Sequence, residues 1–441
     1  MLVVIPGFLY INFGDTTTKD ESGVLLTNKR IYGAKLNDNM IAKNVPLILA
    51  SSQEFQSLGV KNKEEKTLLA KLKDNDDIEE MLPKTKSRNQ QDMNVKPLML
   101  ILAHIHRDEN IRNPLLKEGL NEILKQGVNH LNMMIDVAME INQFARMGNS
   151  VKKLGYKAIS SLIEFQQFFV QGLWTSNDPL MQLPGFTIDE VKKYRKQLRE
   201  HQIPDGKIET FCRLSPEQRA KLGLFGGDKA KLAELEKVIK VMPLVSVESK
   251  IEVVGESTIT ASDIISFTFN IKYDNLPEDQ GPGYIHSEAY PFIKKSNWYI
   301  IIVDAQTKEN IVQIERVQAT GSNVAKFEMK QRFGRAGKFA FHCYICSDSY
   351  IGFDKELGFE VDVLKDDPNR VVEDYSKEDQ DAVKGPGLVQ SMIFEEEEDD
   401  DDSDDNPEAL LERLEQAGIK TPEAKKLADA KAKKSNSELV E

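Results

Sequence analysis

The chain has 441 residues, 40% of them hydrophobic, which is enough for two to three domains with cores of their own. Its formal net charge is -13, but ten acidic residues lie between positions 395 and 405, so the rest of the chain is nearly neutral. Neither part offers the overall basic surface on which phosphate-backbone binding relies. Three cysteines are too few for a disulfide framework and favour a reducing, cytosol-facing location.

The first 94 residues carry a mixed pattern. Residues 1–14 are apolar but lack the basic region and cleavage site of a signal peptide, and they are too short to span a bilayer, which needs about 20 apolar residues. In the segment 15–94, Arg30–Leu36 is expected to form a strand or a strand and a turn. The polar residues 60–94 are expected to form an exposed helix and a linker.

Residues 95–182 are expected to form a helical bundle. Leu98–Ile105 is apolar nearly all round, which predicts the buried centre of the bundle, and two later segments carry one-sided apolar stripes. Residues 183–243 predict a smaller helix-hairpin-helix-like unit that begins at Leu183–Phe186. Capping boxes are expected at Thr187 with Glu190 and at Ser215 with Gln218.

Residues 244–365 predict an immunoglobulin-like, fibronectin type III-like β-sandwich, because about seven short runs are rich in β-formers. Trp298–Val303 is apolar on both faces, as a strand covered on both sides would be, and Trp298 is expected to pack in the core. The fold class is therefore α+β and multidomain. The expected strands are Leu244–Val254, Ile264–Tyr273, Trp298–Val303, Asn310–Val317, Val324–Lys330, Lys338–Cys346 and Leu357–Val363.

Residues 366–441 are expected to be a disordered acidic tail, since closely spaced carboxylates repel one another and bury nothing. The tail is expected to bind a basic partner segment through salt-sensitive contacts. Phosphorylation of Ser403 would add further negative charge. The candidate partner-binding residues are Glu395, Glu396, Glu397, Glu398, Asp399, Asp400, Asp401, Asp402, Asp404 and Asp405.

Motifs that suggest catalysis or metal binding are better explained structurally. His106–Asn113 has the spacing of a kinase catalytic loop but lacks the accompanying phosphate cover, strand lysine and metal ligand, so a polar helix end before Pro114 is expected. Cys343 and Cys346 would lie on opposite faces of one strand. No catalytic, metal or cofactor site is predicted, and we expect the chain not to be an enzyme.

Several segments resemble the C-terminal region of the Sec-sixty-three family, the J-proteins of endoplasmic-reticulum protein translocation. The resemblance extends from about Leu25 to Val363. The segments that carry it are Leu25–Tyr32, Ile48–Phe55, Gly172–Gly185, His286–Phe292, Asn297–Asp304 and Ser347–Asp354.

This resemblance implies a non-catalytic translocation subunit at the endoplasmic-reticulum membrane, with most of the chain on the cytosolic side. The sandwich would dock on the Sec translocon channel through Asp274–Ser296 or Ala319–Asn323, and the tail would recruit the Sec-sixty-two subunit. Residues 1–14 would be the end of a membrane helix. The J-domain, which would summon the lumenal chaperone BiP, would be missing along with most membrane segments. No nucleic-acid partner is expected in this interpretation.

Two other interpretations remain open. The same helical-plus-sandwich module occurs in spliceosomal and related helicases, and Leu183–Phe186 resembles a hairpin whose backbone amides meet a DNA phosphate. Thr187 stands where a second glycine is expected, and the near-neutral body favours a structural hairpin. The chain would then be an accessory module of a nucleic-acid helicase. The third interpretation is a soluble adaptor that has lost its membrane parts.

Overall fold

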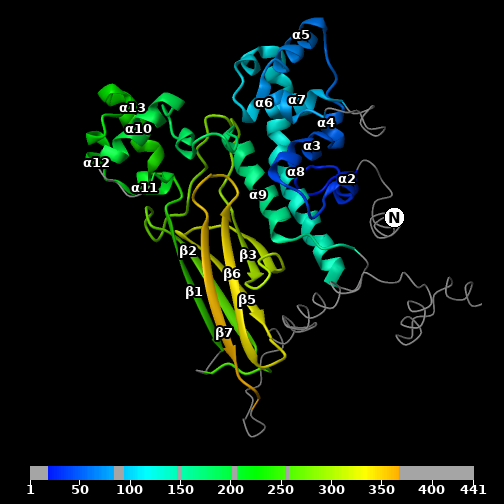
Figure 1. Ribbon diagram of the computed structural model, residues 1–441, viewed down its shortest axis with the longest axis vertical. Helices are drawn as coiled ribbons and strands as arrows, with labels where there is room; N and C mark the ends of the chain where they lie inside the picture. The colour runs from blue at the N-terminus through cyan, green and yellow to red at the C-terminus, as the bar shows by residue number, and fades with distance from the viewer. Residues whose placement is uncertain (1–17, 84–93, 147–150, 201–205, 254–257, 367–441) are drawn as a thin grey trace, which may run out of the picture. The chain divides into compact units, whose positions relative to one another are not determined.

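The computed structural model describes residues 18–83, 94–146, 151–200, 206–253 and 258–366 (Figure 1). Helices occupy the N-terminal half of this part of the chain, and antiparallel sheets follow. The expected α+β class is therefore confirmed. The expected membrane remnant 1–14, much of the expected linker and the tail from residue 367 onward lie outside the described residues.

The helices up to residue 182 pack around the central helix α7. All ten residues of α7 are buried, which confirms the expectation for Leu98–Ile105. Gly127 allows α8 and α9 to approach closely, because a Cβ atom there would lie 2.3 Å from Cζ of Phe169. The helices are α2 (Thr27–Lys35), η1 (Ala42–Asn44), α3 (Val45–Ala50), α4 (Gln53–Gln56), α5 (Lys63–Leu72), α6 (Asp76–Met81), α7 (Lys96–Ile105), η2 (Glu109–Arg112), α8 (Pro114–Arg146), α9 (Tyr156–Gln171) and η3 (Pro179–Gln182).

The strand expected at Arg30–Leu36 is wrong, because most of this segment belongs to helix α2. Its β-formers had suggested a strand, but Tyr32 is fully buried between α2 and α8, and such tertiary packing overrides local propensity. The polar stretch after residue 60 is also more than an exposed helix. Its Glu65 forms an ion pair of 2.7 Å with Lys96, and both side chains are at most 2% exposed.

Four short helices and a turn form a second group, gathered together in Figure 1. Its core is a cluster of aromatic rings, Phe186, Tyr194, Phe211 and Phe225, whose centroids lie 5.0 to 6.4 Å apart in the contacting pairs. The elements are α10 (Ile188–Glu200), α11 (Ile208–Arg213), α12 (Pro216–Lys221), η4 (Leu224–Gly227) and α13 (Lys229–Ile239).

In the described part of the chain, seven strands form two antiparallel sheets, one in the order β1-β2-β5 and the other in the order β4-β3-β6-β7. Phe269 pairs with Phe327 in the first sheet, and Ile300 pairs with Ile345 in the second. The strands are β1 (Val245–Val253), β2 (Ile265–Tyr273), β3 (Trp298–Asp304), β4 (Ile311–Val317), β5 (Val324–Gln331), β6 (Gly337–Ser347) and β7 (Lys355–Val363).

Strand β3 is buried along its whole length, as its sequence predicts. Alternate side chains point to opposite faces of a strand. Tyr299, Ile301 and Val303 belong to the same apolar core as the helices. Trp298, on the other face, donates a hydrogen bond of 2.8 Å from Nε1 to the hydroxyl of Tyr273 in β2. The second sheet is thus covered by helices on one face and by the first sheet on the other.

Helix α9 lies against this sheet and joins it through polar contacts as well (Figure 1). Three buried glutamines donate from their side-chain amides to backbone carbonyl oxygens that follow β6 or end it: Gln167 to Ser347 at 2.7 Å, Gln171 to Ser349 at 2.8 Å and Gln182 to Ile351 at 2.9 Å. We call these contacts the glutamine seam. They pair carbonyl groups that would otherwise be buried without a donor.

Replacing Trp298 should test the burial of β3. Trp298→Ala removes a side chain that is 0% exposed and should lower the free energy of unfolding by about 3–5 kcal/mol. Ile293→Ala, at a side chain that is 79% exposed, should change it by less than about 0.5 kcal/mol. Denaturant unfolding followed by circular dichroism measures both. An unchanged midpoint in Trp298→Ala would contradict the assigned packing.

Candidate functional site

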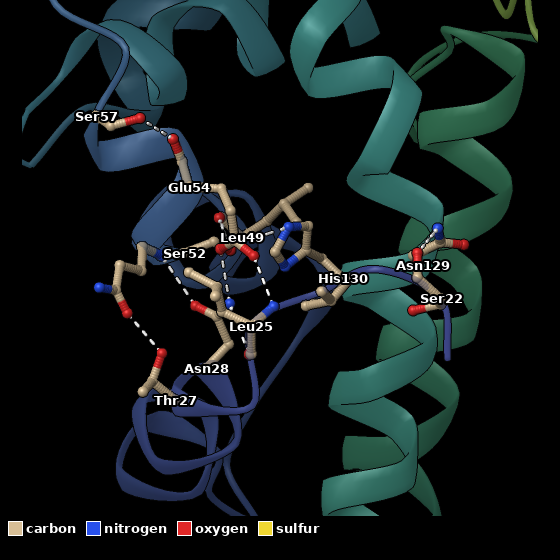
Figure 2. Close-up of polar contacts among 12 residues, drawn as sticks. Ser22, Leu25, Thr27, Asn28, Leu49, Ser52, Glu54, Ser57, Asn129 and His130 are labelled. Atoms are coloured by element: carbon tan, nitrogen blue, oxygen red, sulfur yellow. Dashed lines mark hydrogen bonds and ion pairs between the residues drawn. The ribbon is translucent and has the colours of Figure 1, made fainter. Parts of the chain in front are cut away.

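A buried polar cluster joins three segments that lie far apart in the sequence. Figure 2 shows Asn28, Ser52, Glu54 and His130 converging between α2, α4 and α8. The carboxylate of Glu54 accepts hydrogen bonds from the side chain of Asn28 at 2.7 Å and from the backbone N–H of Leu25 at 2.8 Å. These contacts fix the start of α2 against the helix that carries Glu54.

A chain of hydrogen bonds runs through the centre of this cluster. The hydroxyl of Ser52 donates to the carbonyl of Leu49 at 2.6 Å, so its oxygen accepts from Tyr32 at 2.7 Å. The Tyr32 oxygen then accepts from Nδ1 of His130 at 2.8 Å, which assigns the proton of the neutral imidazole to Nδ1. Nε2 of His130 is left 3.8 Å from Glu54 with no hydrogen-bond partner among the described residues.

Burial decides the charge state of the cluster. Desolvation lowers the pKa of His130 to about 4, despite the opposing effect of the Glu54 carboxylate, so the imidazole is neutral at pH 7. Desolvation also raises the pKa of Tyr32 above its ordinary value. The hydrogen bonds and burial of these side chains give the cluster a role in holding the helices together.

Sequence reasoning missed this cluster, although it singled out two of the segments that build it. Leu25–Tyr32 contributes Asn28 and Tyr32, and Ile48–Phe55 contributes Ser52 and Glu54. The hydroxyl partner of His130, Tyr32, lies 98 positions away in the chain, so no local pattern connects the two residues. The described residues contain no group of three side chains able to hold a metal ion.

The hairpin at Leu183–Phe186 is formed, and its glycine is required. Gly185 has a φ of +79°, and a Cβ atom there would lie 3.0 Å from the ring of Phe225. The expected capping box forms only in part. The first half is present, since Thr187 Oγ1 accepts from the backbone N–H of Glu190 at 3.3 Å. The second half is absent, because the Glu190 carboxylate accepts from the backbone N–H of Phe225 at 3.2 Å and from Lys193 at 2.5 Å. The capping box at Ser215 and Gln218 is confirmed.

The turn η4 presents open backbone beside this hairpin. Gly226 and Gly227 have φ angles of +66° and +81°, and no heavy atom lies within 4 Å of the position that a Cβ atom would take. Lys229 and Lys231 follow directly at the exposed start of α13, while Lys193 lies across from them beside Glu190. We call Lys193, Gly226, Gly227, Lys229 and Lys231 the basic hairpin surface.

The charge of this region differs from that of the whole chain. Residues 183–243 contain 13 Lys and Arg against 9 Asp and Glu, a net charge of +4. This local excess of positive charge does not show in the net charge of the chain outside the acidic run, which is close to zero. Open glycine backbone next to lysines is a combination that suits the phosphate groups of a nucleic acid.

The remaining residues singled out in the sequence have structural places or lie outside the described part. Cys343 lies on the face of β6 shared with Phe341 and Ile345, whereas Cys346 belongs to the core formed with the helices, which confirms that they occupy opposite faces. The kinase-like segment ends α7 and forms η2 before Pro114, as expected. The acidic run Glu395–Asp405, with Ser403, lies outside the described residues.

Curated proteins similar to this chain are helicases and splicing factors. The DExH-box ATP-dependent RNA helicase DExH13 of Arabidopsis thaliana is 25% identical over 371 residues, covering 83% of this chain and 15% of that protein. The U5 small nuclear ribonucleoprotein 200 kDa helicase of Homo sapiens is 21% identical over 362 residues, covering 82% and 15%. Pre-mRNA-splicing factor brr2 of Schizosaccharomyces pombe is 22% identical over 344 residues, covering 78% and 14%. The chain thus spans about 15% of the length of these relatives.

These relatives overturn the translocation interpretation. The expected partners, namely the Sec translocon channel, the Sec-sixty-two subunit and BiP, are wrong, as are the endoplasmic-reticulum location and the exclusion of nucleic acid. Among the described residues, no helix is long and apolar enough to cross a membrane. The error has a physical cause, because two of the recognised segments contribute to a buried cluster that packs helices together, so they carry information about the fold.

The cluster makes a testable contribution to stability. Tyr32→Phe removes the hydroxyl that links His130 to Ser52 and leaves a buried imidazole N–H without an acceptor, so the free energy of unfolding should fall by about 1–3 kcal/mol. Tyr284→Phe, at a side chain that is 59% exposed, is the matched control and should be neutral. Equal stability of the two variants in denaturant unfolding would show that the Tyr32 hydrogen bonds do not contribute to the free energy of unfolding.

The chain also matches a protein-family model. The model of the Sec63 Brl domain matches residues 25–360, about three quarters of the chain. The matched range contains the buried cluster, the glutamine seam, the basic hairpin surface and nearly all of both sheets. The chain therefore belongs to the Sec63 Brl domain family.

Proposed function

We propose that this chain serves as a non-catalytic accessory module of a nucleic-acid helicase and that it holds single-stranded nucleic acid at the basic hairpin surface. The observation that carries the proposal is the similarity of about four fifths of the chain to a small part of much longer RNA helicases. In this proposal, ATP hydrolysis belongs to motor domains outside the matched region. The module would contribute by binding the nucleic acid and holding it in position.

The proposed contact follows from the exposed groups of the hairpin unit. Backbone N–H groups at Gly226 and Gly227 would donate to a phosphate oxygen, and Lys229 and Lys231 would neutralise its charge. The Glu190 carboxylate holds Phe225 by its backbone N–H, so the turn is fixed before a strand arrives. A fixed turn loses little conformational entropy on binding.

The proposal divides the chain by the type of its elements. Residues 15–94 and 95–182 would be the helical part, 183–243 the nucleic-acid unit, and 244–365 an immunoglobulin-like sandwich of the fibronectin type III kind. The facing orders β1-β2-β5 and β4-β3-β6-β7 support the sandwich assignment. Residues from 366 onward would form a disordered acidic tail.

The nucleic-acid proposal predicts a defined loss in a double variant. Lys229→Gln with Lys231→Gln should weaken binding of single-stranded RNA about tenfold and reduce the slope of log affinity against log salt by about 1.4, because each phosphate contact contributes about 0.7 on a single strand. Fluorescence anisotropy at several salt concentrations measures both quantities.

The control replaces two exposed lysines of helix α5. Lys63→Gln with Lys66→Gln removes the same charge away from the hairpin unit and should leave the affinity and the slope close to wild type. Equal losses of affinity in the two double variants would show that binding depends only on the overall charge of the chain. An unmodified chain that binds no RNA at low salt would overturn the proposal itself.

The acidic run Glu395–Asp405 is proposed to bind a basic segment of a partner, with Ser403 as a modification site that would add charge. Replacing the run with Ser and Gly in the full chain should abolish capture of a lysine-rich peptide at low salt. Capture by the unmodified chain should also disappear at high salt, since screening is stronger there. Capture that survives either change would leave the charge mechanism without support.

A further inference from the structure

A cavity of about 500 Å³ lies between helix α9 and the turn that connects β6 to β7. Three aromatic side chains line it, those of Tyr156, Phe168 and Trp174. Thr175 and Gly352 are among its exposed lining residues, so an external chain can reach it. Its volume lies in the range of about 300–1,000 Å³ that is usual for sites that hold a small group.

Two carboxyl groups, Glu164 and Asp354, line the same cavity. The carboxyl group of Asp354 accepts from the backbone N–H of Ser347 at 2.8 Å and from Nε2 of Gln167 at 3.1 Å, which ties it to the glutamine seam. Among the described residues that line the cavity, none is a lysine, an arginine or a histidine. The cavity thus combines negative charge with aromatic faces and holds no positive charge of its own.

The two carboxyl groups also affect each other. Burial raises the pKa of Asp354 to about 6, and the nearby charge of Glu164 adds to this shift, while burial raises the pKa of Glu164 as well. Both residues are exposed at the cavity, and two carboxylates that line one cavity without a counter-ion repel each other. A bound cation would relieve that repulsion.

We propose that this cavity binds the side chain of an arginine carried by a partner polypeptide. A guanidinium group is planar, so it can stack on the face of Trp174, and its N–H groups can donate to both carboxylates. It is also more weakly hydrated than an ammonium group and so loses less on entering an aromatic site. The site lies in the α9 region rather than in α10–α13, and it does not depend on the nucleic-acid proposal.

The chain offers a convenient internal probe, because it has two tryptophans. Trp174 lines the cavity, whereas Trp298 is buried between the two sheets. In the full chain labelled with 5-fluorotryptophan, Trp174→Phe assigns the two fluorine resonances. Titration with Nα-acetyl-arginine methylamide should then shift the Trp174 resonance saturably and leave that of Trp298 unchanged.

Matched compounds and variants define the chemistry. The citrulline analogue, which keeps the shape without the charge, should cause no shift at the same concentrations, and the lysine analogue should bind more weakly than the arginine compound. Glu164→Gln should weaken arginine binding about fivefold, the upper end for a partly exposed ion pair. Glu122→Gln, on an exposed position of α8, should leave binding unchanged.

Three results would overturn the proposal. The first is the absence of a saturable Trp174 shift, and the second is an equal shift of both resonances, which would indicate a general effect on the fold. The third is equal binding of the arginine, lysine and citrulline compounds, since neither charge nor guanidinium shape would then matter. The side chain of Glu164 makes no hydrogen bond or ion pair with the other described residues. The Glu164→Gln variant should therefore fold normally, so a loss of binding would report on the cavity.

Discussion

The burial of strand β3 on both faces is the constraint on which the rest of the structure depends. A strand that is apolar on one face can leave the other to water, but Trp298–Asp304 has no face suited to solvent. The first sheet covers Trp298, and the helices cover Tyr299, Ile301 and Val303. The helices and the second sheet therefore share one core, and the boundary between these element types is not a boundary between independent folding units.

The glutamine seam shows how the polar backbone at this junction is satisfied. Ser347 and Ser349 are fully buried, so without the glutamines their carbonyl groups would lose hydrogen bonding to water without gaining a donor. A glutamine side chain supplies that donor without introducing a charge. The third glutamine follows α9 and lies directly before the hairpin at Leu183–Phe186, so the contacts that line the cavity beside α9 also anchor the start of the hairpin unit.

Sequence reasoning succeeded where one periodic pattern determined the environment and failed where distant partners did. The run of β-formers in β2, the two-sided apolar run of β3 and the all-round apolar α7 were predicted correctly because each pattern lies within one short segment of the chain. Arg30–Leu36 was assigned wrongly because the partner of Tyr32 lies on α8, far along the chain. The family was recognised but not its functional setting, since two of the recognised segments, Leu25–Tyr32 and Ile48–Phe55, contribute to a buried cluster that packs the helices. The positive charge of residues 183–243 was hidden by averaging over a neutral body.

Hydrogen exchange of the full chain tests the shared core most directly. Ile301 is fully buried on the helical face of β3, and Ile301→Ala should lower the free energy of unfolding by about 2–5 kcal/mol. If the helices and the second sheet share one core, the slowest-exchanging amides of α7 in the helical part and of β6 in the second sheet should lose protection by the same free energy. Loss of protection in one of them while the other stays at the wild-type level would contradict the shared core.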